Sequence, residues 1–127
     1  VVSDRNFTHG ILKATRECVI NVPTAELAEE VVGCGSVSGR RVDKFERFGL
    51  TPVRGAVVRA PLVDECHANL ECRVVDASLA RKYDLFVLEV VKAWIDPSRR
   101  RPRTLHHAGG RSFMIAGPTI ELPSRKR

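Results

Sequence analysis

The sequence predicts an α+β fold in which an antiparallel β-barrel is accompanied by two short helices. Residues 69–77 alternate between apolar and polar side chains, which is typical of a half-buried strand. Residues 85–95 are apolar on both faces, which is typical of a strand covered on both sides. These strands come late and follow one another, so alternating βαβ units are not indicated. We expect the 127 residues to form one domain over residues 1–127.

The first third of the chain is predicted to contain both helices, with one strand between them. Residues 6–15 have apolar side chains at helical spacing, which indicates a short helix. Residues 17–22 have apolar side chains at the even positions, so we expect a strand that Pro23 ends. Thr24 then caps a second helix, which ends at the glycine-rich residues 33–35.

The middle of the chain is predicted to be irregular until the strand at 69–77. Residues 35–41 form a polar loop, residues 42–48 form a helical turn that Gly49 ends, and residues 52–61 are extended. Alternation divides the strand at 69–77 into a core face and a solvent face. The core face has Leu70, Cys72 and Val74, and the solvent face has Asn69, Glu71 and Arg73.

The strand at 85–95 is predicted to have a barrel interior on one face and a helix or second subunit on the other. Glu89 within it is either a buried ion-pair partner or an interface residue. Residues 97–104 form a basic Pro/Arg loop, and residues 111–117 form a last short strand. Between them, His106 and His107 either contact a ligand or belong to a turn, and the turn is favoured.

The net charge of +6 arises entirely in the last quarter of the chain. Residues 1–96 contain 13 Lys and Arg against 14 Asp and Glu, whereas residues 97–127 contain eight against one. The body of the domain therefore lacks a basic nucleic-acid surface, and no apolar run is long enough to cross a membrane. We expect neither nucleic acid nor membrane as a partner. The basic residues of the last quarter are Arg99, Arg100, Arg101, Arg103, Arg111, Arg125, Lys126 and Arg127.

The four cysteines include no CxxC pair, which favours an intracellular, reduced and therefore cytoplasmic setting. Cys18 and Cys72 are interpreted as inert core residues, and Cys66 as an exposed one beside His67. Cys34 is either a reactive thiol or a small apolar residue at a helix end, and the second interpretation is favoured. The cysteine and histidine spacings match no usual zinc knuckle, so no metal is predicted.

Two short patches combine the groups that bind a phosphate: flexible backbone, hydroxyl donors and positive charge. One lies at residues 3–8, where an extended segment enters a helix, and the other at residues 36–44. Either patch alone is also compatible with a solvated loop. The second patch consists of Ser36, Ser38, Gly39, Arg40, Arg41 and Lys44.

Longer phrases make a family resemblance visible. The phrase CGSVSGRRVDKFERFGLTP at 34–52 follows ECVINVPTAELAEEVVG at 17–33 and precedes APLVDECHANLECRVV at 60–75. LFVLEVVKAWID at 85–96 and HHAGGRSFMIAG at 106–117 complete the series. In this order the phrases resemble the flavin reductase-like family, the flavoredoxin branch of the FMN-binding split barrels.

The resemblance implies a split β-barrel homodimer that binds FMN noncovalently. It implies that NAD(P)H or a redox partner supplies electrons, which pass to free flavin or an acceptor protein, so that no side chain serves as acid, base or nucleophile. It also implies that the first barrel strands belong before Val1, so an N-terminally truncated domain is expected. By position, Ser3, Arg5, Asn6 and Thr8 match the segment along the flavin phosphate and ribityl chain, and Ser38, Arg40 and Lys44 match the phrase that closes over the cofactor.

A second class of function remains open. Tyr83 and Leu88 stand where family members often have His and Gly, so the choice between NADH and NADPH is not predicted. The alternative is a non-catalytic fold remnant or interaction module, which contacts an acidic partner or nucleic acid through its basic C-terminal segment.

Overall fold

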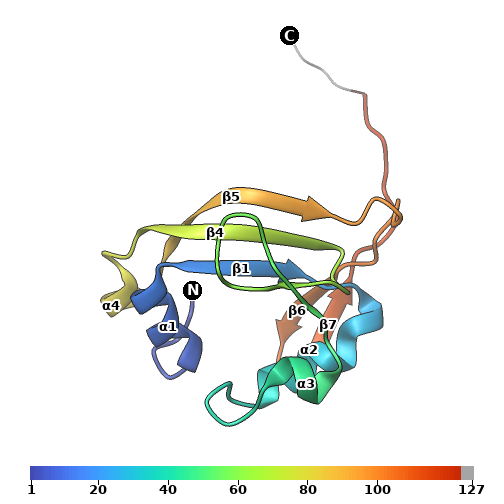
Figure 1. The fold of residues 1–127 in the computed structure, drawn as a ribbon. Coiled ribbons are helices and arrows are strands. Elements are labelled where there is room, and N and C mark those ends of the chain that lie inside the picture. The colour runs from blue at the N-terminus through green and yellow to red at the C-terminus, as the bar shows by residue number, and fades with distance from the viewer. Residues whose placement is uncertain (124–127) are drawn as a thin grey trace.

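A computed structural model describes residues 1–123 of the chain and centres on an antiparallel three-stranded sheet (Figure 1). Its strands are β1 (Glu17–Val22), β4 (Ala68–Asp76) and β5 (Val87–Ile95), in the order β1-β4-β5. All three strands were predicted, and the pairing is antiparallel as expected. This sheet is the scaffold on which the remaining elements are arranged.

Two small antiparallel sheets complete the strand content of the described residues. The strand β2 (Pro52–Val53) pairs with β3 (Leu62–Val63), and β6 (Leu105–Gly109) pairs with β7 (Ser112–Ile115). The last strand was predicted, but β6 was not, because His106 and His107 were assigned to a turn. They lie on β6, since the turn falls after them at Gly110, which has φ 58°. The three sheets do not close into a barrel within residues 1–123.

Four α-helices lie in the described residues, where two short helices were predicted. They are α1 (Phe7–Thr15), α2 (Ala28–Ser36), α3 (Lys44–Phe48) and α4 (Ala80–Tyr83), and a 3₁₀ turn η1 (Ala25–Leu27) leads into α2. None of these helices is long and apolar enough to cross a membrane. The predicted helix at 6–15 and the predicted turn before Gly49 are confirmed as α1 and α3.

The second helix differs from its prediction at both ends. Thr24 makes no capping hydrogen bond, and its hydroxyl instead accepts one from Arg99 at 3.1 Å. The helix continues through Gly33 and ends only at Ser36. The Phe48 ring of α3 occupies the space that a side chain at Gly33 would fill. The glycine thus permits close packing of two helices and does not end the first.

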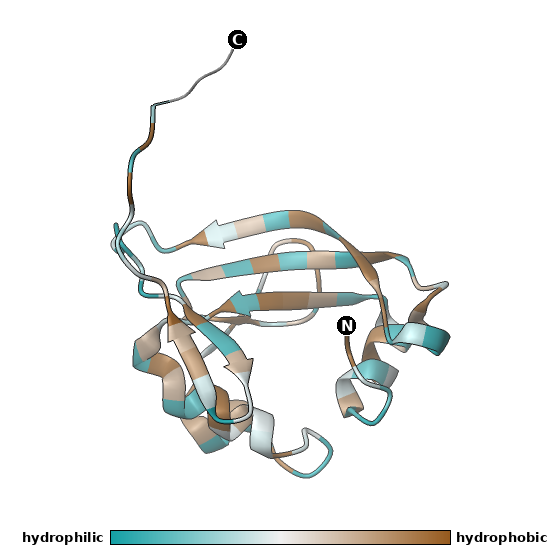
Figure 2. Ribbon diagram, turned by 180° about the vertical axis from the view of Figure 1, so that it is seen from behind, coloured by the Kyte–Doolittle hydropathy of each residue, from teal (hydrophilic) through white to brown (hydrophobic). Residues whose placement is uncertain are grey.

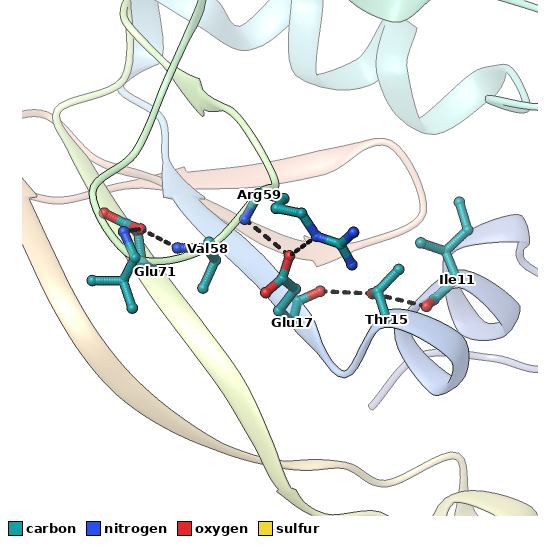
Figure 3. Close-up of polar contacts among 7 residues, drawn as sticks. Ile11, Thr15, Glu17, Val58, Arg59 and Glu71 are labelled. Atoms are coloured by element: carbon teal, nitrogen blue, oxygen red, sulfur yellow. Dashed lines mark hydrogen bonds and ion pairs between the residues drawn. The ribbon is translucent and has the colours of Figure 1, made fainter.

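The solvent face predicted for β4 is wrong at Asn69 and Glu71. Glu71 is fully buried, because the 54–60 segment crosses that face and donates backbone N–H groups to its carboxylate (Figure 3). Asn69 is buried by a similar exchange, accepting from the Val63 N–H at 2.9 Å and donating to its carbonyl at 3.2 Å. Arg73 is exposed as predicted.

The prediction that both faces of β5 are covered is not met within the described chain. The strand forms an edge of the sheet, and apolar residues recur along it in the open (Figure 2). Val90 is 50% exposed and Ile95 66% exposed. The apolar core lies instead between α1, β4 and α4, where buried Leu12, Val74 and Phe86 pack together.

The predicted Pro/Arg loop at 97–104 is present between β5 and β6, but not all of it is free in solvent. Arg99 pairs with Asp96 at 3.2 Å and with Glu26 at 3.5 Å, which fastens the loop to η1, the turn before α2. Arg100, Arg101, Arg103 and Arg111 are exposed. The remaining basic residues, Arg125, Lys126 and Arg127, lie outside the described residues.

The four cysteines are free thiols. Cys18 and Cys72 oppose one another on β1 and β4, and burial raises the pKa of both thiols. Cys66 was predicted to be exposed, but it is buried, and burial raises the pKa of its thiol to about 11. Within residues 1–123, no group of three or more metal-ligating side chains is placed to hold a metal ion.

Candidate phosphate-binding cavity

A cavity of about 940 Å³ lies between the N-terminal turn of α1 and the stretch that joins α2 to α3. Its walls are residues 5–8 with Ile11 on one side and residues 34–45 on the other. This volume is within the range of small-molecule sites in proteins. The two walls are the two patches that the sequence singled out, separated along the chain by β1 and α2.

Six of the seven predicted site residues line this cavity. Ser3 does not, because its hydroxyl turns toward its own segment and accepts from the Arg5 N–H at 3.4 Å. The fold therefore brings the two predicted patches together, while the role of each residue toward a ligand stays a prediction. The six residues are Arg5, Asn6, Thr8, Ser38, Arg40 and Lys44.

Positive charge dominates the cavity lining. Arg5, Arg40, Arg41 and Lys44 contribute four cationic side chains, against one carboxylate, Asp43. Asp43 caps α3, accepting from the Phe45 N–H at 2.9 Å and the Glu46 N–H at 3.3 Å. Because its charge already serves these donors, the cavity favours an anion.

Lys44 is held at the first residue of α3, and its ammonium donates to the Cys34 carbonyl at the end of α2. An ammonium has three donors, so two remain for another acceptor. The Cys34 thiol also lines the cavity; burial raises its pKa, Lys44 opposes that shift and Glu30 adds to it. A raised pKa keeps this thiol protonated and agrees with the interpretation of Cys34 as an unreactive residue.

The two serine hydroxyls in the wall formed by residues 34–45 differ in whether their proton is free to donate to a ligand. Ser36 donates its proton to the Val32 carbonyl at 2.7 Å, as a side chain in the last turn of a helix commonly does. Ser38 accepts from the Arg40 N–H at 3.3 Å, which leaves its own proton to donate. Ser38 is thus the better placed of the two hydroxyls to contact an anion.

Sequence reasoning missed the aromatic contact across the cavity. The Arg40 guanidinium carbon lies 4.9 Å from the centroid of the Phe7 ring. The periodicity of α1 gave a partial signal, because Phe7 and Ile11 are one turn apart on the same helix and both line the cavity. A pattern within one helix does not reveal its partner in a distant loop.

A second cavity of about 500 Å³ lies near the end of β5 and contains none of the predicted site residues. It is lined in part by Trp94, His67, Asp64 and Asp96. Its carboxylates make it a poorer anion site than the first cavity. The cationic and hydroxyl groups that line the first cavity suit the binding and orientation of an anion.

Comparison with known proteins places most of the chain in one sequence family. The profile described as "Flavin reductase like domain" matches residues 1–114. An uncharacterized protein of Archaeoglobus fulgidus is 39% identical over 90 residues, which are 71% of this chain and 51% of that protein. An uncharacterized protein of Escherichia coli (strain K12) is 33% identical over 132 residues, covering 94% of this chain and 70% of its own. The chain thus spans about half the length of the archaeal relative.

Solved structures share the fold. An FMN-binding domain of a flavin reductases-like enzyme from Shewanella baltica has a TM-score of 0.85 at 25% identity, covering 97% of this chain and 72% of its own. The flavoredoxin of Desulfovibrio vulgaris (Miyazaki F) has a TM-score of 0.82 at 21% identity, with coverages of 95% and 70%. Because the flavoredoxin is only 21% identical in sequence, its similarity to this chain concerns the fold alone.

Proposed function

This chain belongs to the flavin reductase-like domain family, and from that premise we propose that its cavity binds the phosphate end of FMN. Through the bound flavin, electrons pass from NAD(P)H or a redox partner to free flavin or an acceptor protein. The observation behind the proposal is the convergence of both donor patches on one cationic cavity. The similar Shewanella baltica structure, described as FMN-binding, supports the choice of ligand.

The cavity has the donor set that a phosphate monoester requires. The phosphate carries nearly two negative charges at neutral pH and accepts several hydrogen bonds. Lys44 offers two free protons, Arg40 a planar set of donors and Ser38 a hydroxyl. Thr8 and Asn6 line the opposite wall, and in this proposal they donate to the polyol chain of the ligand. These residues bind and orient, and none moves a proton in the reaction.

FMN supplies hydride and single-electron chemistry when bound, and the protein supplies position and charge. The cationic wall favours the phosphate, which fixes the cofactor from its polar end. A split β-barrel that holds the flavin ring is part of the same proposal.

Absorbance and affinity test the proposal together. The purified chain, mixed with FMN and freed of excess ligand, is expected to retain the yellow absorbance of a flavin. A charge-assisted hydrogen bond contributes about 1.5–3 kcal/mol, and each 1.4 kcal/mol changes Kd about tenfold. Lys44→Ala or Arg40→Ala is therefore expected to weaken FMN about tenfold to a hundredfold.

Riboflavin, which lacks the phosphate, is the internal control for these variants. Its affinity should hardly change in Lys44→Ala, whereas equal losses for both flavins would mean that Lys44 is structural. Lys13→Ala, on the exposed part of α1 and outside the cavity lining, is the matched control for loss of one charge. If FMN affinity is the same in Lys44→Ala, Arg40→Ala and the original chain, the phosphate does not bind in this cavity.

We also propose that the chain forms a homodimer through β5. Val87, Val90, Trp94 and Ile95 present apolar surface at the edge of the sheet, and a second chain is one way to cover it. Sedimentation equilibrium at micromolar concentration is expected to give a species of twice the chain mass, and Ile95→Lys should reduce that species. A monomer under these conditions would contradict the dimer.

One observation favours a second candidate function. Arg100, Arg101, Arg103 and Arg111 are exposed, and no ion pair within residues 1–123 engages them. Exposed positive charge of this kind fits an acidic protein partner. Replacing all four by Gln should abolish salt-sensitive binding to polyglutamate if these arginines bind acidic chains, and it should leave FMN affinity unchanged.

A further inference from the structure

One aromatic side chain in the cavity contacts the opposite wall. Phe7 begins α1, and its ring lies 4.9 Å from the Arg40 guanidinium carbon, within the range of a cation–π contact. Gly39 lies beside the same ring, because a Cβ at that position would be in ordinary van der Waals contact with Phe7 Cδ1 at 3.5 Å. The 37–43 loop therefore rests on the Phe7 ring at this point.

The contact with Phe7 engages the charge of the guanidinium and gives its N–H groups no oxygen or nitrogen acceptor. Those N–H groups lie in the guanidinium plane and donate along it. The Arg40 backbone N–H donates to Ser38 Oγ, and within residues 1–123 its side chain donates to no protein acceptor. The in-plane donors of Arg40 thus stay available for two parallel hydrogen bonds to a phosphate.

The contact between Phe7 and Arg40 is the polar contact that links the two walls of the cavity within residues 1–123. Within residues 1–123, no hydrogen bond or ion pair joins α1 to the wall formed by residues 34–45. A free arginine side chain loses rotamer entropy when it binds a ligand. A side chain that is already held by the Phe7 ring before the ligand binds loses less of this entropy on binding.

We propose that Phe7 is a positioning residue for the anion site. Its ring holds the Arg40 guanidinium across the cavity, so that the free edge of the guanidinium meets the phosphate of the ligand. The ring itself has no donor for a phosphate, so its effect on affinity passes through Arg40. This inference rests on the proposed function, because the ligand it concerns is the phosphate end of FMN.

A double-mutant cycle tests whether Phe7 acts through Arg40. Loss of an exposed cation–π contact is expected to weaken FMN about two- to fivefold in Phe7→Leu. In the Arg40→Ala background the same replacement should change FMN affinity very little, because the guanidinium that it positions is gone. Phe7→Tyr keeps an aromatic ring and should restore most of the affinity. Riboflavin should respond to none of these changes.

Ile11→Ala is the matched control. Ile11 lies one turn further along α1, lines the same cavity and has no contact to Arg40 among those described. Removing its side chain takes apolar surface from the same wall, so any effect on FMN should be equal with and without Arg40. If Phe7→Leu likewise weakens FMN equally in both backgrounds, its ring contributes general packing and the positioning role is overturned.

A readout without flavin separates this inference from the proposed function. Trypsin cleaves after arginine, and a loop restrained by the Phe7 ring should be cleaved after Arg40 and Arg41 more slowly than an unrestrained one. Phe7→Leu is expected to speed this cleavage severalfold relative to Ile11→Ala. Faster cleavage together with no FMN binding by the original chain would overturn the proposed function and support the restraint of Arg40. Unchanged cleavage would overturn the restraint itself.

Discussion

The 54–60 segment and the 37–43 loop are both short and irregular, yet a buried charge holds the first and exposed charges line the second. The Glu71 carboxylate accepts from the N–H groups of Ala56 at 2.9 Å and of Val57 and Val58 at 2.7 Å each. Within the 37–43 loop, the Arg41 N–H donates to the Ser38 carbonyl and the Arg40 N–H to Ser38 Oγ, Asp43 caps α3, and the Arg40 side chain contacts Phe7.

The 54–60 segment is therefore expected to matter for stability and the 37–43 loop for ligand binding. A buried carboxylate is stabilising only when all its hydrogen bonds are made, so Glu71 fixes one conformation of the segment that covers it. Trp94 adds a fourth donor, its indole N–H, at 2.8 Å. Within residues 1–123, no ion pair neutralises Arg40 or Arg41 in the 37–43 loop, which keeps these cations available to a ligand. Changes in the first region should therefore affect folding, and changes in the second should affect affinity.

The largest effect on stability is expected for Glu71→Ala. The change leaves the buried Val58 N–H without an acceptor and removes three further hydrogen bonds. Unsatisfied buried donors cost about 1–3 kcal/mol each, so the free energy of unfolding should fall by about 3 kcal/mol. Urea unfolding followed by circular dichroism measures this change.

Glu65→Ala is the matched control for that experiment. Glu65 accepts from the Thr51 N–H at 2.9 and 3.1 Å, but this N–H is exposed and can bond to water instead. Lys44→Ala sharpens the comparison further, because it should weaken FMN while changing unfolding little. A loss of stability in Lys44→Ala as large as in Glu71→Ala would mean that the two regions are not distinct in this way.

Acid should weaken the attachment of the 54–60 segment to the Glu71 carboxylate, here called the Glu71 anchor, in a defined pH range. Burial alone would raise the pKa of Glu71, but hydrogen bonds from Val58, Ala56, Trp94 and Val57 outweigh it and lower the pKa from 4.5 to about 2. The carboxyl thus binds a proton more readily in the unfolded chain. Its stabilising contribution is complete above about pH 4.5 and is lost as the pH falls toward 2.

Glu71→Gln isolates this dependence, because glutamine does not titrate. The free energy of unfolding should fall less steeply between pH 4.5 and 2 in the variant than in the original chain. Some slope should remain, since hydrogen bonds from Ser98 and Ser78 also lower the pKa values of Asp96 and Asp76. If the free energy of unfolding falls equally steeply with pH in both proteins, Glu71 does not cause the loss of stability in acid.

The sequence predicted the residues that line the cavity better than it predicted the burial of Glu71. The reason is that the first feature is visible in local sequence and the second depends on a distant segment. Donor types at 3–8 and 36–44 are visible as local patches, and the family resemblance gave them roles. Glu71 is different, because alternation along β4 tells which face a side chain is on but not what covers that face. The covering segment comes from a stretch whose own pattern is irregular, so its backbone donors leave no trace in the sequence.

The same limit explains the other differences. Apolar residues on β5 indicated a covered strand, but coverage depends on neighbours that the strand itself does not specify. Gly33 was interpreted as a helix end from its residue type alone, whereas its role depends on Phe48, a residue of another helix. The Arg40–Phe7 stack likewise joins residues far apart in the chain. Local patterns gave the types of the three long strands and of α1, whereas β6 and α4 were missed, and contacts between elements decided burial.

Gly33 and Gly35 provide a test of the wall on the α2 side. Both lie in α2, but a Cβ at Gly33 would overlap the Phe48 ring, while at Gly35 it would meet nothing within 4 Å. Overpacking typically costs about 1–3 kcal/mol, so Gly33→Ala should destabilise the protein by that amount. Gly35→Ala should be neutral or stabilise by up to about 1 kcal/mol, because alanine favours the helix. Thermal unfolding of the pair gives the sign, and equal effects would contradict packing of Phe48 on Gly33.

The smallest effect is expected at Gly49, which ends the helix that presents Lys44 to the cavity. Gly49 has φ 63°, in the left-handed region, and its N–H bonds back to α3. A Cβ there meets no neighbour, so the cost of Gly49→Ala is conformational only, about 1 kcal/mol. Asparagine tolerates this region better than alanine, and Gly49→Asn should therefore cost less. Urea unfolding should rank the original chain above Asn and Asn above Ala. FMN affinity should be preserved in both variants, because α3 still begins at Asp43 and Lys44; a loss of FMN affinity would show that the end of α3 also sets the position of Lys44.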